Sequence, residues 1–568
     1  MRVLGIHDGY NSCAALTEDG AVVAVVQEER MTGVKNHAGF PHRSIDAVLR
    51  LAGRTRDDVD LVAMNGRHIG VPVNRPELLK KFREFASPVG VVKRLARSTP
   101  INDWYRERCA AERREHLRAA GFEAAKVRYV EHHEAHASAA YFGGPWREGP
   151  VLVLTCDGAG DDLSATVNVG AGGTLKRLAE IPDADSLGLI YAMVTFLLGM
   201  TPNDHEYKLM GLAPYAPVRD TESVYRMLRE YLKVSPRNPL VWERARGYPH
   251  SFYSYPFLRK ALELQRFDAI CGGLQRFTED LLAEWVAGCV RETGLPRIAL
   301  SGGVGMNVKA NKRIADLPEV ESLFVFPSCT DESNAIGAAW SVYAAEQRAR
   351  NEPVDIPPLR DIYWGHSYSD EACADAIREA GPGINARHVD DPEAEIAKLL
   401  SQGEVVARFS GRTEFGARAL GNRSILADPS DLRVVRIINE MVKSRDFWMP
   451  FAPSVLDSAG PRYVRNPKGL AYPYMILAFD SNGSSDGFQA ALHPYDRTIR
   501  PQEVYADWNP SYHRLIAEFE RLTGRAIVLN TSLNLHGHPL VSSPQQALQV
   551  FMNSGLPHLA LGHYLLSK

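Results

Sequence analysis

Residues 2–27 read RVLGIHDGYNSCAALTEDGAVVAVVQ, and this stretch indicates the fold class. Its apolar residues predict a buried strand at 2–6, a second strand at 12–17 and a return strand at 21–27. The pair Asp19-Gly20 supplies the positive φ angles that a tight hairpin turn needs. The stretch therefore predicts a strand, a polar turn and a β-hairpin in direct succession.

This succession resembles the start of the actin, sugar-kinase and Hsp70 ATPase fold. In that fold the first hairpin turn lies near the nucleotide phosphates. Residues 151–155 are a near-continuous apolar run that predicts a second central strand, with residues 164–168 expected in a second hairpin. The resemblance implies a mixed α/β protein that begins with an actin/Hsp70-like, duplicated ATPase-fold domain.

The chain has 568 residues, too many for one hydrophobic core, so roughly two to four domains are expected. The proline-rich residues 352–360 are the best candidate linker. They predict a first domain at 1–352 and a second at 361–568.

Composition restricts the class of partner. The net charge of −3 and the pI near 6.7 give no general basic field, so no nucleic-acid partner is expected. Seven scattered cysteines without a CxxC pair indicate a reducing, cytoplasmic compartment. The sequence shows neither a signal-peptide core nor an apolar run of about 18 residues, so no membrane association is expected. The oligomeric state stays open, with a homodimer as one alternative.

The segment Glu131-His132-His133-Glu134-Ala135-His136 is the best candidate metal-binding element. In a helix, His132 and His136 share one face with Cβ atoms about 5–6 Å apart, close enough to bind one divalent cation. His133 points about 100° away and is a weaker candidate. A histidine-rich surface helix would show the same pattern, and carboxylates from elsewhere are needed to complete a metal site.

Two aspartates and one glycine-rich turn follow predicted strands. Asp157 ends the apolar strand and precedes glycine, and Asp331 precedes a helix predicted at 333–344, so each is a ligand candidate or a cap. The turn after the strand at 298–301 contains Gly302, Gly303, Gly305 and Asn307, which would let backbone N–H groups approach a nucleotide. Lys208 could reach an anionic group, although a surface lysine would look the same.

The second half carries a basic, glycine-containing stretch at 408–424. Guanidinium groups bind oxyanions bidentately, so this stretch predicts a site for a phosphate-rich ligand. Lys443, Arg445 and Arg500 add further cations. Residues 66–122 are predicted to be inserted, solvated helices, with an acceptor-binding lid as the alternative.

Together the motifs resemble the O-carbamoyltransferases that modify nodulation factors and antibiotics. The motifs that carry the resemblance are EER (28–30), HHEAHA (132–137), DG (157–158), KLMGLA (208–213), GGVGMN (302–307), Asp331 with GAA (337–339), FGARALGNRS (415–424), PFAPS (450–454), RPQ (500–502) and LNTSLN (529–534). They follow the family's order over nearly the whole chain.

The resemblance implies two catalytic halves. The C-terminal half is similar to the threonylcarbamoyl-adenylate-synthase α/β fold. It would form carbamoyl adenylate from carbamoyl phosphate and ATP, and the ATP could carry a bound Mg(II). The matching phosphate- and carbamoyl-binding positions are Arg418, Arg423, Lys443, Arg500, Asn530 and Ser532, of which Arg418 and Lys443 would be catalytic. The N-terminal half would transfer the carbamoyl group to a hydroxyl of a small natural product and release AMP.

In the N-terminal half, the resemblance implies a divalent metal, usually Fe(II). Its ligands would be His132, His136, Asp157 and Asp331, with both histidines counted as catalytic. One departure concerns the base, because Tyr10-Asn11 stands where the family usually has His-Asp; His7 or Asp8 is the alternative. Two other functions remain alternatives: a tRNA threonylcarbamoyl-type enzyme and a non-catalytic nucleotide-binding scaffold.

Overall fold

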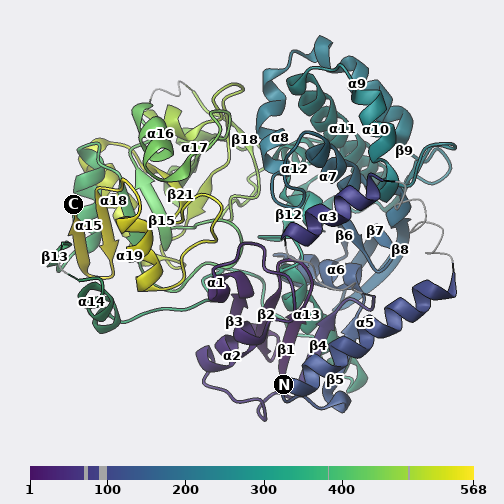
Figure 1. Cartoon of the computed structure of the whole chain (residues 1–568), viewed down its shortest axis with the longest axis horizontal. Helices are drawn as coiled ribbons and strands as arrows, with labels where there is room; N and C mark the ends of the chain where they lie inside the picture. The colour runs from purple at the N-terminus through teal and green to yellow at the C-terminus, as the bar shows by residue number, and fades with distance from the viewer. Residues whose placement is uncertain (69–74, 88–98, 382, 484–486) are drawn as a thin grey trace. The chain divides into compact units, whose positions relative to one another are not determined.

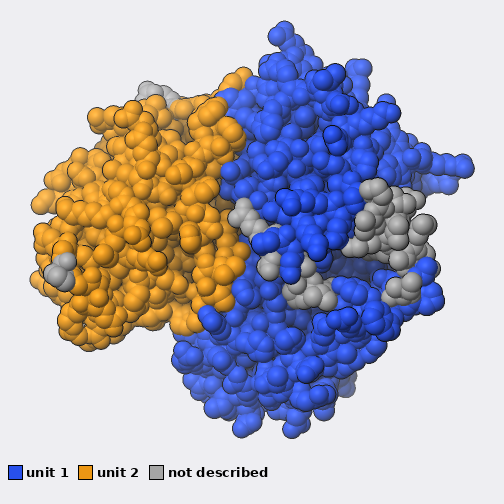
Figure 2. All heavy atoms as spheres, in the orientation of Figure 1, with its two compact units in different colours: residues 1–28, 36–359 blue, residues 29–35, 360–568 orange. Residues whose placement is uncertain are grey.

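A computed structural model describes residues 1–68, 75–87, 99–381, 383–483 and 487–568. The chain forms two compact units (Figure 2). Unit 1 contains residues 1–28 and 36–359, and unit 2 contains residues 29–35 and 360–568. The short segment 29–35 thus belongs to unit 2, although unit 1 surrounds it in the sequence.

Unit 1 begins with a five-stranded sheet of order β3-β2-β1-β4-β5 (Figure 1). Its strands are β1 (Arg2–His7), β2 (Cys13–Glu18), β3 (Ala21–Gln27), β4 (Leu61–Asn65) and β5 (Val127–Val130). The first three strands are antiparallel neighbours, whereas β1, β4 and β5 are parallel. The predicted N-terminal hairpin is therefore confirmed.

A second five-stranded sheet repeats this topology, with the order β12-β11-β6-β7-β8. Its strands are β6 (Val151–Gly160), β7 (Leu163–Ala171), β8 (Thr174–Pro182), β11 (Arg297–Ser301) and β12 (Ser322–Val325). Here β6, β7 and β8 are antiparallel neighbours, and β6, β11 and β12 are parallel. Since strand order and direction match those of the first sheet, unit 1 is a duplicated ATPase fold.

Helices α6 (His132–Gly143) and α13 (Ser333–Ala349) are equivalent elements of the two repeats, because each follows the last strand of its sheet. They pack directly against one another. A Cβ atom at Gly337 would lie only 1.9 Å from the carbonyl oxygen of Ala135, so a side chain there would prevent this approach. The packing brings the start of α6 close to the loop that precedes α13.

The remaining helices of unit 1 cover the sheets or lie in insertions. They are α2 (His42–Leu51), α3 (Arg75–Phe85), α5 (Pro100–Ala119), α7 (Leu187–Leu197), α8 (Glu206–Leu212), α9 (Val218–Tyr231), α10 (Tyr255–Leu262), α11 (Phe267–Thr293) and α12 (Val308–Ala315), while α1 (Glu28–Thr32) leads into unit 2. Among the helices that the structure describes, none combines the length and apolar character needed to cross a membrane.

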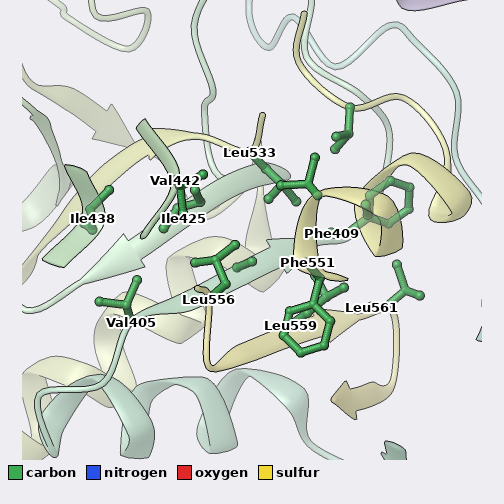
Figure 3. Packing of buried hydrophobic residues seen from close by; sticks show 14 of the residues in the cluster. Val405, Phe409, Ile425, Ile438, Val442, Leu533, Phe551, Leu556, Leu559 and Leu561 are labelled. Atoms are coloured by element: carbon green, nitrogen blue, oxygen red, sulfur yellow. The ribbon is translucent and has the colours of Figure 1, made fainter. Parts of the chain in front are cut away.

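Unit 2 is built on an eight-stranded mixed sheet of order β13-β23-β22-β14-β15-β21-β16-β20. Its strands are β13 (Asn385–His388), β14 (Val406–Phe409), β15 (Arg423–Ala427), β16 (Ala452–Leu456), β20 (Gln502–Val504), β21 (Ile527–Ser532), β22 (His558–Leu561) and β23 (Tyr564–Ser567). The apolar side chains Phe409, Ile425, Phe551 and Leu559 lie in its main core (Figure 3).

Helices of unit 2 flank this sheet. They are α14 (Asp370–Glu379), α15 (Pro392–Ser401), α16 (Arg433–Ile438), α17 (Gly460–Tyr463), α18 (Pro510–Thr523) and α19 (Pro544–Met552). A π-helical turn, Asn439–Lys443, extends α16 and ends at Ser444 in the left-handed conformation. This turn places Lys443 beside the end of β21. Both units are α/β, as the sequence predicts.

Candidate functional site

The start of α6 is fixed by its cap. The side chain of Glu131 accepts hydrogen bonds from the backbone N–H groups of His133 and Glu134, which satisfies two of the unpaired donors of the first turn. His132 is therefore the first helical residue, and His136 lies one turn later on the same face. Their ring centroids are 4.8 Å apart.

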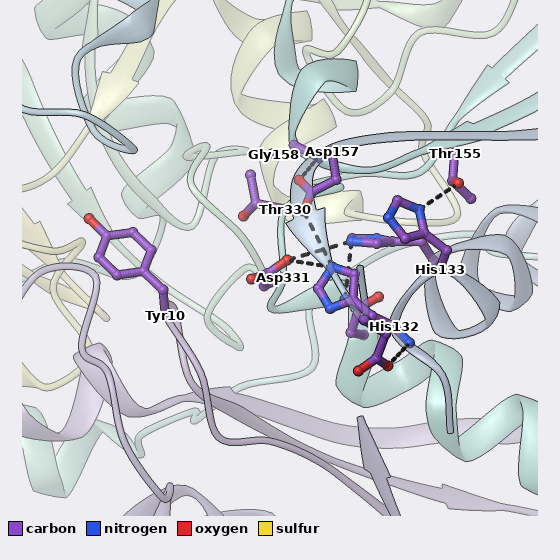
Figure 4. A network of polar contacts seen from close by, with 12 residues as sticks. Tyr10, His132, His133, Thr155, Asp157, Gly158, Thr330 and Asp331 are labelled. Carbon is purple, nitrogen blue, oxygen red and sulfur yellow. Dashed lines mark hydrogen bonds and ion pairs between the residues drawn. The ribbon is translucent and has the colours of Figure 1, made fainter. Parts of the chain in front are cut away.

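The two histidines meet two carboxylates (Figure 4). Nε2 of His132 lies 3.3 Å from Oδ2 of Asp157 and 3.4 Å from Oδ1 of Asp331, and Nε2 of His136 lies 3.5 Å from the same Asp331 oxygen. One potential ligand atom from each of the four residues lies within 4.8 Å of the others. The structure thus brings together all four residues proposed as metal ligands.

The outward-facing atoms of this cluster have partners of their own. Nδ1 of His136 lies 3.2 Å from Oγ of Ser301, and Oδ1 of Asp157 accepts the N–H of Gly303 at 2.8 Å. These contacts turn Nε2 of His136 and Oδ2 of Asp157 toward the other candidate ligands, which is how outer contacts orient metal ligands; Nε2 of His136 also lies 3.1 Å from Nδ2 of Asn334. Oδ1 of Asp331 is buried and accepts no hydrogen bond from any described residue. Two imidazoles and two carboxylates, one of which has this unsatisfied oxygen, fit a divalent metal.

The charge balance of the cluster supports this assignment. Burial disfavours a charged His132, but the carboxylates of Asp331 and Asp157 outweigh burial and raise the pKa of His132 to about 10. Burial also opposes charge on Asp157, yet its hydrogen bond to His132 and the charge of His136 lower its pKa. The carboxylates therefore require positive charge at the centre, and a divalent cation would supply it.

The end of β6 lies tightly against His132, and this yields a test. A Cβ atom at Gly160 would lie 2.1 Å from the imidazole ring of His132, whereas one at Gly158 would meet no atom within 4 Å. We expect Gly160→Ala to displace the ring and to weaken Co(II) binding about 10- to 100-fold. A Co(II) titration followed by absorption measures this effect, with Gly158→Ala as the matched control. Equal affinities in the two variants would contradict the placement of His132.

The candidate bases lie next to this cluster. Asp8 accepts a hydrogen bond from Arg113 at 2.8 Å, so its carboxylate is paired. His7 contacts the carbonyl oxygen of Tyr10 through Nε2 at 2.9 Å and Asn65 through Nδ1 at 2.9 Å. Asn11, which replaces the aspartate of the family pattern, contacts Thr330 and Glu332. The hydrogen bonds of His7 and Asp8 therefore do not identify either residue as the base.

The glycine-rich turn after β11 packs against the end of β6, next to the candidate metal ligand Asp157. Gly302 has a φ of 104°, and a Cβ atom there would lie 2.2 Å from the carbonyl oxygen of Cys156, so this position requires glycine. Gly305 is buried against Cys329. Asn307 caps α12 by accepting the N–H of Ala310. Lys208 lies within α8.

Unit 2 contains a cluster of cations, formed by Lys35, Arg418, Lys443, Arg445 and Arg500. Lys443 is 2% exposed, and its pKa is lowered well below the usual value by burial and by the charges of Arg445 and Lys35. Burial and the charges of Arg418 and Arg445 lower the pKa of Arg500 in the same way. Among the described residues, Arg500 forms no hydrogen bond or ion pair. A phosphate-bearing ligand would relieve this repulsion.

Arg423, another predicted phosphate ligand, has a different environment from Arg500. Its guanidinium donates to the carbonyl oxygens of Ser410 at 2.6 Å and Gly411 at 3.1 Å and lies over the ring of Phe409. Both terminal nitrogens of Arg423 are thus bound to backbone carbonyl groups of the fold, while its Nε is buried without a hydrogen-bond partner among the described residues. Arg408 likewise donates to the carbonyl oxygen of Gly421.

The end of β21 contacts the cation cluster through Ser532. Ser532 accepts a hydrogen bond from Nζ of Lys443 at 3.2 Å. Asn530 is buried, and its amide donates to Oγ of Ser454 at 3.0 Å, while its Oδ1 is unsatisfied among the described residues. Ser532 thus lies beside the cation Lys443, whereas the side chain of Asn530 is hydrogen-bonded to Ser454.

Sequence reasoning missed Lys35, which the structure places near Lys443. The available signal was its position five residues after the EER motif, whose Arg30 donates to the carbonyl oxygens of Leu540 at 3.3 Å and Gly416 at 2.5 Å. Residues 29–35 therefore complete unit 2 and bring a cation to its site.

Comparisons with known proteins agree with this arrangement. Residues 2–340 match the family model described as carbamoyltransferase N-terminus, and residues 397–568 match the one described as carbamoyltransferase C-terminus. The nodulation protein NolNO of Sinorhizobium fredii is 32% identical over 99% of this chain and 79% of its own length. An uncharacterized protein of Synechocystis is 31% identical over 100% of this chain and 97% of its own length.

Among solved structures, HypF of T. kodakarensis is similar with a TM-score of 0.32 and 13% sequence identity. The match covers 61% of this chain and 48% of that chain.

Proposed function

Since this chain belongs to the carbamoyltransferase family, we propose that it is an ATP-dependent O-carbamoyltransferase with two reaction sites. In unit 2, water would cleave carbamoyl phosphate to carbamate and phosphate, and a carbamate oxygen would attack the α-phosphorus of ATP. The products are carbamoyl adenylate and pyrophosphate. In unit 1, an acceptor hydroxyl would attack the carbamoyl carbon, giving the O-carbamoyl product and AMP.

The observation that carries this proposal is the cation cluster of unit 2. Arg500 and Lys443 each lie near two other cations, and burial together with those charges lowers the pKa of each. Such a site is unfavourable without a ligand and complementary to one that brings several phosphate oxygens. Arg418, Arg500 and Lys443 would bind the phosphates of both substrates and stabilise the charge that develops on the departing pyrophosphate.

In unit 1, His132, His136, Asp157 and Asp331 would hold a divalent metal, with Fe(II) as the proposed ion. When bound, the metal would act as a Lewis acid that polarises an oxygen of the carbamoyl adenylate. Ser301 and the N–H of Gly303 keep His136 and Asp157 in their inward orientation. The acceptor is proposed to be a small natural product with a free hydroxyl, such as an antibiotic, a macrolide or a sugar-containing molecule.

The proposal is tested by pyrophosphate release from the purified protein. We expect release when ATP and carbamoyl phosphate are both present, even without an acceptor, and none when either is omitted. A coupled pyrophosphate assay measures the rate, and Arg418→Ala serves as the inactive control. Cleavage of ATP to ADP, or pyrophosphate release that does not depend on carbamoyl phosphate, would contradict the proposed first step.

A further inference from the structure

Helix α5 contains a buried arginine, which the prediction of solvated helices at residues 66–122 did not include. Arg113 is 6% exposed. Its Nε donates to Oδ2 of Asp8 at 2.8 Å, Nη1 donates to the carbonyl oxygen of Gly66 at 2.6 Å, and Nη2 donates to the carbonyl oxygen of Asn65 at 2.6 Å. One side chain of α5 therefore joins the residue after β1 to the end of β4.

Asn65 continues this contact toward the candidate metal ligand. Its side chain is fully buried, and its Nδ2 lies 2.9 Å from Nδ1 of His7 and 3.5 Å from Nδ1 of His132. Oδ1 of Asn65 is buried and has no hydrogen-bond partner among the described residues. The amide thus lies against two imidazole rings, on the side of His132 opposite to Asp157 and Asp331.

We propose that Asn65 and Arg113 are positioning residues that connect helix α5 to the ring of His132. The proposal rests on the metal-binding role given to His132 above. Asn65 contacts the nitrogen of His132 that does not face the carboxylates, which is the atom through which outer contacts fix the orientation of a metal-bound histidine. Arg113 holds the backbone of Asn65 in place.

Because Asp8 is buried, its carboxylate depends on the guanidinium of Arg113 as a partner. Asp8 is 3% exposed, and its Oδ1 already lacks a hydrogen bond among the described residues. Removing the guanidinium would leave a buried, unpaired carboxylate and two unsatisfied carbonyl groups. The ends of β1 and β4 would then rearrange, and Asn65 would lose its fixed distance to His132.

The test is a Co(II) titration of the metal-free, full-length protein, followed by the absorption of the bound ion. We expect Asn65→Ala and Arg113→Met to weaken Co(II) affinity about 10- to 100-fold and to change the absorption spectrum of bound Co(II). Arg114→Met is the matched control, since Arg114 is the next residue of α5 and its side chain is exposed in an ion pair with Glu107. Its affinity should stay within about twofold of the wild type.

Two conservative variants separate positioning from general damage to the fold. Arg113→Lys keeps the charge opposite Asp8 but cannot bridge both carbonyl groups, so its affinity should lie between those of the wild type and Arg113→Met. Asn65→Asp places a carboxylate acceptor opposite Nδ1 of His132, the nitrogen that carries the proton when Nε2 binds a metal, so it should bind Co(II) more tightly than Asn65→Ala. Affinities equal to that of Arg114→Met in all four variants would overturn the proposal.

The outcome also separates this proposal from the proposed function. If the wild type binds no Co(II), the metal site and the positioning role both fail. If the variants lose Co(II) affinity but the wild type transfers no carbamoyl group, the positioning role stands and the proposed reaction fails.

Discussion

His136→Ala is expected to abolish carbamoyl transfer to an acceptor while pyrophosphate release continues at the wild-type rate. The substitution removes one of the four residues of the proposed metal site, whose potential ligand atoms lie within 4.8 Å of one another. Loss of a metal ligand should reduce the transfer rate at least about 100- to 1,000-fold. The cation cluster belongs to the other unit, so formation of carbamoyl adenylate should not change.

The two partial reactions are measured separately, as pyrophosphate release without acceptor and as AMP formation with it. His133→Gln is the matched control on the same helix. Burial lowers the pKa of His133 to about 3, so it is neutral, and its Nδ1 contacts Thr155 at 2.8 Å rather than the carboxylates. Glutamine keeps a neutral polar group, and both rates should remain within a few-fold of wild type. Equal loss of both reactions in His136→Ala would refute the assignment of two sites.

Arg500→Met is expected to stabilise the ligand-free protein and to eliminate pyrophosphate release. Burial and the neighbouring charges of Arg418 and Arg445 disfavour the charged guanidinium, and no described residue pairs with it. Methionine removes that repulsion, because it is an uncharged, apolar side chain about as long as the apolar part of arginine. The same change removes a cation that the phosphates would bind. Thermal unfolding should therefore show a higher Tm without ligand and little further rise when ATP and carbamoyl phosphate are added.

Arg423→Met provides the opposite case within the same unit. Arg423 is fully buried, but its guanidinium donates to the carbonyl oxygens of Ser410, Gly411 and His366. Losing these bonds should lower the free energy of unfolding by about 2–4 kcal/mol. A fall in the ligand-free Tm of Arg500→Met as large as that of Arg423→Met would show that Arg500 supports the fold.

Local patterns were sufficient for much of unit 1. The contact between His132 and His136 follows from one helical period, which is visible in the sequence, whereas the cap at Glu131 was not predicted. Asp157 was predictable because carboxylates at the ends of central strands lie at one edge of a sheet. The matching order of the two five-stranded sheets repeats the strand and hairpin pattern of residues 2–27.

Long-range contacts account for what the sequence could not show. Arg418 and Arg423 lie in one basic stretch, yet Arg418 lies near Arg500 whereas Arg423 donates to carbonyl groups. Residue type cannot separate these roles, because the partners of each guanidinium come from distant segments. The role of Arg113 also depends on a distant partner. Its helix has mostly exposed, polar residues, and only the contact with Asp8, 105 positions away, reveals that Arg113 is buried.

The segment 29–35 affects how this enzyme can be dissected. A fragment that starts at the proline-rich linker would contain the whole eight-stranded sheet but would lack Arg30, which bonds to the carbonyl groups of Gly416 and Leu540, and Lys35. A gene cut at that linker would therefore encode an incomplete unit 2. Supplying residues 29–35 as a separate peptide, or fusing them to the fragment, would be required for complementation between the two pieces.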